Sequence, residues 1–235
     1  MFQQEFVDTV ATAAMSYNEA VQAQAADMAQ ELSVWDLTMR GGWIMIPLAL
    51  LSVVCVYIFI ERCLVIRRAQ KEDSSFMERI REYIHEGEIE SARRLCQKTD
   101  TPYARLIGKG ISRIGRPMND VLVTIENTGN IEIAALEKGL PWLATTAAGG
   151  PMIGFLGTVI GMVNAFYNLA SAGSSANIAV LADGIYAALV TTVAGLIVGI
   201  IALFAYNYLV ARINKVMNAL EARTMEFMDL LNEPA

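Results

Sequence analysis

The chain has 235 residues, of which 54% are hydrophobic and only 18% charged, and its formal net charge is −6. Soluble domains are typically about 45–50% apolar and about 25% charged. Asp183 is the only Asp, Glu, Lys or Arg between residues 139 and 211. This composition excludes an ordinary soluble domain and a nucleic-acid-binding surface, and it indicates membrane spans, which need about 20 apolar residues each.

The first 40 residues are predicted to form an amphipathic helix outside the membrane. Apolar residues recur there at three- to four-residue intervals, at Phe6, Val10, Ala14, Tyr17 and Val21. We expect this helix either to lie on membrane lipid or to pack on neighbouring subunits or fray. The start of the chain lacks the basic and apolar regions of a signal peptide, so insertion through the chain's own helices is expected.

The first transmembrane helix is predicted over residues 41–60, between Arg40 and the Glu61–Arg62 pair. Trp43 and Tyr57 lie near its ends, where interfacial aromatic residues are common.

Residues 61–138 are polar and predict a cytoplasmic helical domain. The sequence SFMERIREYIHEGEIESARRLCQ reads as two helices separated by a turn at Gly87. A further helix is expected at about 103–114, followed by a break at Gly115–Pro117 with Asn119 as the helix cap. From about Val121 we expect a helix that runs on into the second span.

The second and third spans are predicted over residues 139–170 and 177–213, joined by a short outer loop at 171–176 and followed by a tail at 214–235. At 1.5 Å per residue they are about 45 and 55 Å long, against a hydrocarbon core of about 30 Å, so both must protrude. The fold class is therefore an all-α membrane protein with three transmembrane helices, the second and third extending into a cytoplasmic helical domain.

Basic residues follow the first and third spans and are nearly absent from the other side of the predicted membrane. They are Arg62, Arg67, Arg68 and Lys71 after the first span, and Arg212, Lys215 and Arg223 after the third. Because Lys and Arg favour the cytoplasmic side, we expect the N-terminus outside and the C-terminus in the cytoplasm.

The titratable and nucleophilic residues form no catalytic or metal-binding pattern. The three cysteines are odd in number and include no CxxC, so neither a disulfide framework nor a zinc site is indicated. His85 is the only histidine and is interpreted as a solvated surface residue rather than a pH sensor. No HExxH or phosphate-binding loop is present. We expect no enzymatic activity, no cofactor and no metal.

Three GxxxG repeats in the second and third spans predict close helix packing, and the packing positions are Gly154, Gly157, Gly161, Gly195 and Gly199. The threonines of these spans have two interpretations. Each hydroxyl can bond back to a carbonyl of its own helix, or Thr158 and Thr192 can face a shared lumen that passes protons. Storing a proton needs a carboxylate, and Asp183 is better explained as an N-cap of the third span.

The segment GGPMIGFLGTVIGMVNAFYNLA followed by LADGIYAALVTTVAGLIVGIIALFAYN resembles the MotA/TolQ/ExbB proton channel family, most of all its ExbB/TolQ branch. The resemblance covers roughly residues 40–215. It implies a homopentamer in the bacterial inner membrane, with a periplasmic N-terminus and a pore lined by the second and third helices. It also implies an ExbD/TolR-like single-span dimer in the pore, whose Asp carries the proton, and a TonB-like protein moved by the current.

The resemblance assigns roles to individual positions. Thr158 and Thr192 match the two pore threonines of the family, and Pro151 matches the proline that opens the second-span motif. Ala187 stands where this branch usually has a pore Glu. Either that Glu has been replaced by engineering, or this branch dispenses with it, as flagellar-type stators do. Our hypothesis is that the chain assembles normally but conducts or couples poorly.

The leading functional prediction is a stator-like subunit of a proton-motive-force-driven motor that energises TonB-dependent outer-membrane transport. The alternatives are a TolQ-like envelope-maintenance subunit, a motility or gliding motor subunit, and a non-conducting oligomeric membrane scaffold. A transporter with inverted repeats is disfavoured because the spans show no internal symmetry.

Overall fold

The computed structural model describes residues 41–70, 75–172 and 178–232. The predicted helix over residues 1–40 and most of the predicted 171–176 loop lie outside the described residues. Every secondary-structure element in the described part is helical, so the predicted all-α fold class is confirmed.

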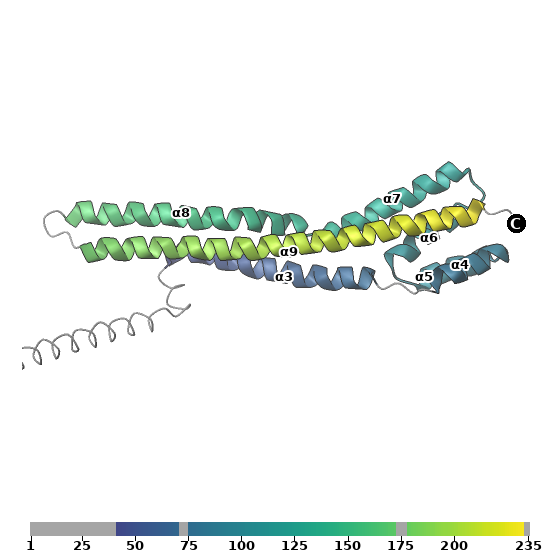
Figure 1. The fold of residues 1–235 in the computed structure, drawn as a ribbon, viewed down its shortest axis with the longest axis horizontal. Helices are drawn as coiled ribbons and strands as arrows, with labels where there is room; N and C mark the ends of the chain where they lie inside the picture. The colour runs from purple at the N-terminus through teal and green to yellow at the C-terminus, as the bar shows by residue number, and fades with distance from the viewer. Residues whose placement is uncertain (1–40, 71–74, 173–177, 233–235) are drawn as a thin grey trace, which may run out of the picture. The chain divides into compact units, whose positions relative to one another are not determined.

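Within the described residues, three long helices are each apolar and long enough to cross a membrane (Figure 1). They are α3 (Met45–Ala69), which follows the short 3-10 turn η1 (Gly42–Ile44), α8 (Leu140–Ala172) and α9 (Ile178–Asn232). The chain divides into two compact units. Of the described residues, those within 41–49 and 151–196 belong to the first unit, and those within 50–150 and 197–232 belong to the second. Parts of all three long helices therefore belong to each unit.

Four shorter helices lie in the described part of the second unit. They are α4 (Phe76–His85), α5 (Ile89–Lys98), α6 (Pro102–Ile111) and α7 (Met118–Glu137). The predicted turn at Gly87 separates α4 from α5, and the glycine has a φ of 74°, a conformation that side chains disfavour. The Thr101 side chain caps α6 by accepting a hydrogen bond from the Ala104 amide at 3.3 Å.

Two details of the predicted helix boundaries are wrong. Asn119 does not cap α7, because the helix begins at Met118 after Pro117, and no side-chain cap bond forms there. The helix from Val121 does not run on into the second span either. It ends at Glu137, and α8 begins at Leu140, because Gly139 has a φ of 92° and cannot continue an α-helix.

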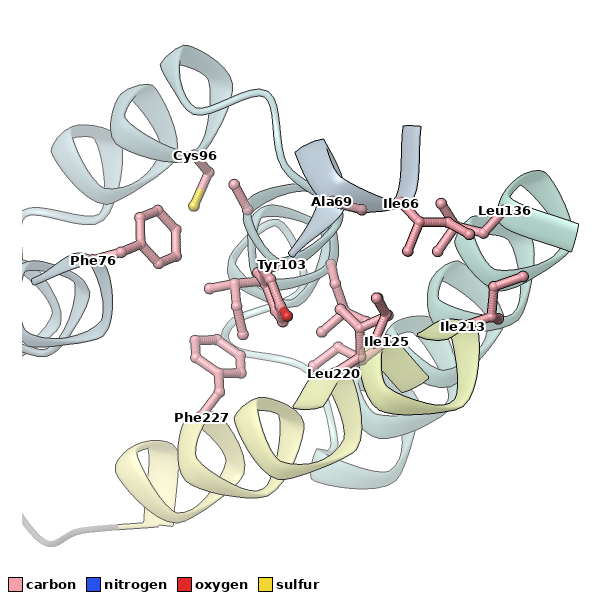
Figure 2. Packing of buried hydrophobic residues seen from close by; sticks show 14 of the residues in the cluster. Ile66, Ala69, Phe76, Cys96, Tyr103, Ile125, Leu136, Ile213, Leu220 and Phe227 are labelled. Carbon is pink, nitrogen blue, oxygen red and sulfur yellow. The ribbon is translucent and has the colours of Figure 1, made fainter. Parts of the chain in front are cut away.

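The second unit has a hydrophobic core built from α3 to α7, the first turns of α8 and the C-terminal half of α9. Figure 2 shows Ile125 of α7 close to Leu220 of α9, with Phe227 pointing toward Tyr103. Phe227 is fully buried, and a Cβ added at Gly110 would lie only 2.6 Å from its ring. Gly110 is therefore required where α6 packs against the last turns of α9.

Arg62 is a buried charge that anchors α3 to the end of α7. Its side chain is 9% exposed and lies 2.6 Å from the Glu61 carboxylate, and it donates a hydrogen bond to the Ala135 carbonyl at 3.0 Å. The last carbonyls of a helix lack backbone partners and favour a nearby cation. The ion pair and this cap together offset the cost of burying the guanidinium.

Candidate functional site

The site is built on the contact between α8 and α9, which runs through glycines. A Cβ added at Gly154 would lie 2.8 Å from the Thr191 carbonyl oxygen, one at Gly157 would lie 2.8 Å from the Thr191 Cβ and collide with its hydroxyl, and one at Gly161 would lie 2.7 Å from the Ala188 side chain. These glycines share one face of α8, since they are spaced by three and four residues. Larger side chains would push the two helices apart.

The other predicted packing positions lie on α9. Gly195 is buried opposite Gly154, and its Cα would lie 3.1 Å from a Cβ added at Gly154. Gly199 is also buried, but it belongs to the second unit. Sequence reasoning missed Gly184, where an added Cβ would lie 2.7 Å from the Ala165 side chain. Its spacing from Ala188, Thr191 and Gly195 on one helix face is the signal that would have found it.

The structure brings Thr158 and Thr192 together across this glycine contact. Their hydroxyls hydrogen-bond to each other. Each also reaches a carbonyl of the opposite helix: Thr192 Oγ1 lies 3.1 Å from the Gly154 oxygen, and Thr158 Oγ1 lies 3.2 Å from the Ala188 oxygen. The threonine hydroxyls therefore link the two helices directly.

The alternative interpretation, in which each hydroxyl bonds back to its own helix, describes other threonines. Thr145 and Thr146 donate to the carbonyls of Pro141 and Trp142, each at 2.8 Å. Thr192 makes no such bond among the contacts of the described residues, and Thr158 has only a long one of 3.4 Å to Gly154. The pair thus differs from the ordinary membrane threonine.

Sequence reasoning gave Thr191 no role of its own among the threonines of the spans. The residue is 3% exposed and is one of three buried polar or charged residues in the described part of the chain. Its hydroxyl lies 2.7 Å from the Ala188 carbonyl and 3.3 Å from that of Gly154. Thr191 therefore touches the same two carbonyls that the Thr158–Thr192 pair uses.

A groove of about 550 Å³ runs along one face of α8 beside the hydroxyl pair. It is lined by Phe155, Thr158, Val159, Met162, Val163 and Phe166. Thr158 has the only polar side chain of these six, so its hydroxyl lies between an apolar groove and the contact with α9. An apolar helix placed in the groove would meet one hydrogen-bonding group.

The remaining site positions are Asp183, Ala187 and Pro151. The prediction that Asp183 caps the third span is wrong, because α9 begins at Ile178 and Asp183 lies inside it. Ala187 is half-buried and lies one turn after Asp183, so the two residues share a face of α9. Pro151 lies inside α8, where it offers no N–H to the preceding turn.

Long apolar helices joined through glycines and hydroxyls define a helical membrane protein with a polar cluster inside its helix pair. The chain belongs to the MotA/TolQ/ExbB proton channel family, whose profile matches residues 98–222. Its relatives place it in the ExbB/TolQ branch of that family.

Three relatives illustrate the match. An ExbB homolog of Methanothermobacter thermautotrophicus is 33% identical over 135 residues, which are 57% of this chain and 47% of the relative. The Tol-Pal system protein TolQ of Haemophilus influenzae is 40% identical over 106 residues, 45% of this chain and 46% of the relative. The biopolymer transport protein ExbB of Neisseria meningitidis is 30% identical over 177 residues, 71% of this chain and 80% of the relative. The chain thus spans about half the length of the first two.

Proposed function

We propose that this chain is the pore-forming, stator-like subunit of a proton-motive-force-driven motor in the bacterial inner membrane. Five copies would surround a pore lined by α8 and α9, with the N-terminus periplasmic and the C-terminus cytoplasmic. The observation that carries the proposal is the Thr158–Thr192 hydroxyl pair, set between glycine-packed helices in a chain of the proton channel family.

The chemistry of the pair explains why a partner is needed. A hydroxyl can donate and accept a hydrogen bond at the same time, so it can take part in a proton path, but it does not hold an extra proton at physiological pH. The proposed partner is an ExbD/TolR-like single-span dimer whose Asp holds the proton. The apolar groove beside Thr158 supports this arrangement, since it fits an apolar helix and offers one polar contact.

Within the branch, we propose the ExbB-like role, in which the motor acts through a TonB-like protein on outer-membrane transport. The ExbB of Neisseria meningitidis, of which the match covers 80%, supports this version. A TolQ-like role in envelope maintenance is the second candidate, and the 40% identity to the Haemophilus influenzae TolQ favours it.

The test is proton flux into liposomes that contain the chain and the ExbD-like protein of the same organism, driven by a membrane potential. Replacing Thr158 or Thr192 with Val should reduce the flux to that of liposomes without protein, because the hydroxyls are lost while the side-chain size is kept. Replacement with Ser should preserve most of the flux. Thr145→Val is the matched control, since the Thr145 hydroxyl bonds only its own helix among the described contacts.

Two results would contradict the proposal. Unchanged flux in both Val variants would exclude the hydroxyl pair from the path. A correctly assembled complex that never conducts, with or without the partner, would instead support the non-conducting scaffold.

A further inference from the structure

Thr191 shares its hydrogen-bond acceptors with the Thr158–Thr192 pair. Its Oγ1 lies 2.7 Å from the Ala188 carbonyl, the shortest hydroxyl contact that this oxygen receives in the described residues. The Thr158 hydroxyl approaches the same carbonyl from the other helix at 3.2 Å. Two hydroxyls therefore compete for one acceptor.

The Ala188 carbonyl has no capacity for both. A carbonyl oxygen has two lone pairs, and in an α-helix one of them accepts the N–H four residues later, here that of Thr192. Thr191 takes the second lone pair at the shorter distance. The proton of Thr158 is then left with the hydroxyl of Thr192 as its acceptor.

The Gly154 carbonyl completes the arrangement. By the same helix geometry it accepts the N–H of Thr158, so one lone pair remains. The closest hydroxyl is that of Thr192 at 3.1 Å, ahead of Thr191 at 3.3 Å and Thr158 at 3.4 Å. Each hydroxyl proton has an acceptor, and neither carbonyl accepts more than two hydrogen bonds, when Thr158 donates to Thr192 and Thr192 donates to Gly154.

We infer that Thr191 is a positioning residue, which holds the hydroxyl pair in the order Thr158 to Thr192 to the Gly154 carbonyl. The proton of Thr158 is then engaged on the α9 side, and its oxygen offers only lone pairs to the groove on α8. A group in that groove can hydrogen-bond Thr158 only as a donor, as a protonated carboxylic acid or water does and a carboxylate does not. Thr191 would thus make the site selective for the protonated form of an acid. This consequence rests on the proposed function, whereas the order of the hydroxyls does not.

Removing the Thr191 hydroxyl should reverse the order. With Thr191→Val the Ala188 carbonyl regains a free lone pair, and Thr158 donates to it. Thr192 then donates to Thr158 instead of Gly154, because the two hydroxyls are hydrogen-bonded to each other and one of them must supply the proton. The Gly154 carbonyl then loses its hydroxyl bond. The hydrogen bonding of the Gly154 carbonyl therefore distinguishes the two orders of the hydroxyls.

A single pair of labels reports on that carbonyl. Phe155 is the only phenylalanine in the sequence that follows a glycine, so carbonyl-¹³C glycine with ¹⁵N phenylalanine selects the Gly154–Phe155 peptide alone. The experiment is solid-state NMR of the full chain in lipid bilayers, without a partner or proton flux. A carbonyl ¹³C resonance moves to lower chemical shift when it loses a hydrogen bond.

We expect Thr191→Val to move the Gly154 resonance to lower chemical shift, as Thr192→Val does, and the double variant to show no further change. Thr191→Ser should restore the wild-type position, because the hydroxyl returns although the methyl group is lost. A residue that only fills space would behave in the opposite way, with Val neutral and Ser disruptive.

Two outcomes would overturn the inference. An unchanged resonance in Thr191→Val would show that Thr191 does not set the order, and additive shifts in the double variant would show that it bonds Gly154 independently of Thr192. If Thr191→Val does not fold and its spectrum loses the helical signals, Thr191→Ser provides the test instead. Its Gly154 carbonyl resonance must coincide with that of the wild type. Loss of flux in the Thr158 and Thr192 variants tests the proposed function separately.

Discussion

The guanidinium of Arg105 on α6 donates two parallel hydrogen bonds to the Glu132 carboxylate on α7, each with a nitrogen–oxygen distance of 2.7 Å. Such bidentate pairs are stronger and more directional than single contacts. The hydrogen bonds to Glu132 raise the pKa of Arg105, and Asp100 adds to the effect. The pair therefore fixes the register of α6 against α7.

Glu132→Gln should destabilise the helical unit, because one carboxylate oxygen that pairs with Arg105 is lost. In a double-mutant cycle with Arg105→Gln we expect a coupling energy of about 1 kcal/mol, at the upper end for a partly exposed pair. The measurement is the free energy of unfolding in detergent. Asp100→Asn is the control and should have less effect, since the Asp100 side chain is 95% exposed. A coupling energy of zero would contradict the assigned role.

Gly157→Ala should loosen the α8–α9 contact, because its methyl group would collide with the Thr191 hydroxyl. Overpacking of this kind typically costs about 1–3 kcal/mol. Gly149→Ala on the same helix is the matched control, since nothing lies within 4 Å of its added Cβ and alanine favours helix by up to about 1 kcal/mol. Thermal unfolding in detergent compares the two. Equal melting temperatures would argue against the glycine contact.

Ala187→Glu should increase coupling if the missing pore carboxylate limits this chain. Ala187 is half-buried on α9, which is a candidate membrane span, and an ionisable residue within a membrane span is usually functional. We expect a severalfold gain in energy-dependent uptake in a complementation assay. Ala187→Gln, of the same size but uncharged, should give none. The absence of any gain with Glu would refute the hypothesis that the chain couples poorly for lack of this group.

From the burial of the Cys96 thiol we predict a loss of stability at alkaline pH. Burial among α5 and α6 raises the pKa of its thiol from 9.0 to about 11. The unfolded chain releases this proton at a lower pH than the folded chain, so the thiol lowers stability progressively as the pH rises from about 9 to 11 and leaves it unchanged below that range. Comparing the unfolding of wild type and Cys96→Ala at pH 8 and pH 11 isolates the effect, with Cys63→Ala as control. A difference between Cys96→Ala and wild type that does not depend on pH would contradict it.

The sequence was sufficient to predict the helices, since their signals are local. Apolar periodicity and the turn at Gly87 defined α4 and α5, and long uncharged runs defined the spans. The errors concern helix ends. Asn119 and Asp183 are good capping residues by type, but each helix starts earlier than they do. The break at Gly139 depends on a backbone angle that composition does not determine.

The site was predictable in part. The motifs pointed to Thr158 and Thr192 and to the glycines that bring α8 and α9 together. The role of Thr191 was missed, because three hydroxyls share two carbonyls only at one particular register of the two helices. Periodicity identifies the faces that meet, but it does not determine which atoms lie opposite one another.

The order in which the chain is synthesised determines when the core of the second unit can be completed. Phe227 and Leu220 pack against helices that leave the ribosome about a hundred residues earlier, and two membrane spans are made in between. Until the last turns of α9 emerge, the side of α6 and α7 that packs against them stays uncovered (Figure 2). Completion of this core therefore follows the synthesis of α8 and of the apolar part of α9, and a chain cut before Leu220 leaves apolar surface for chaperones and proteases to recognise.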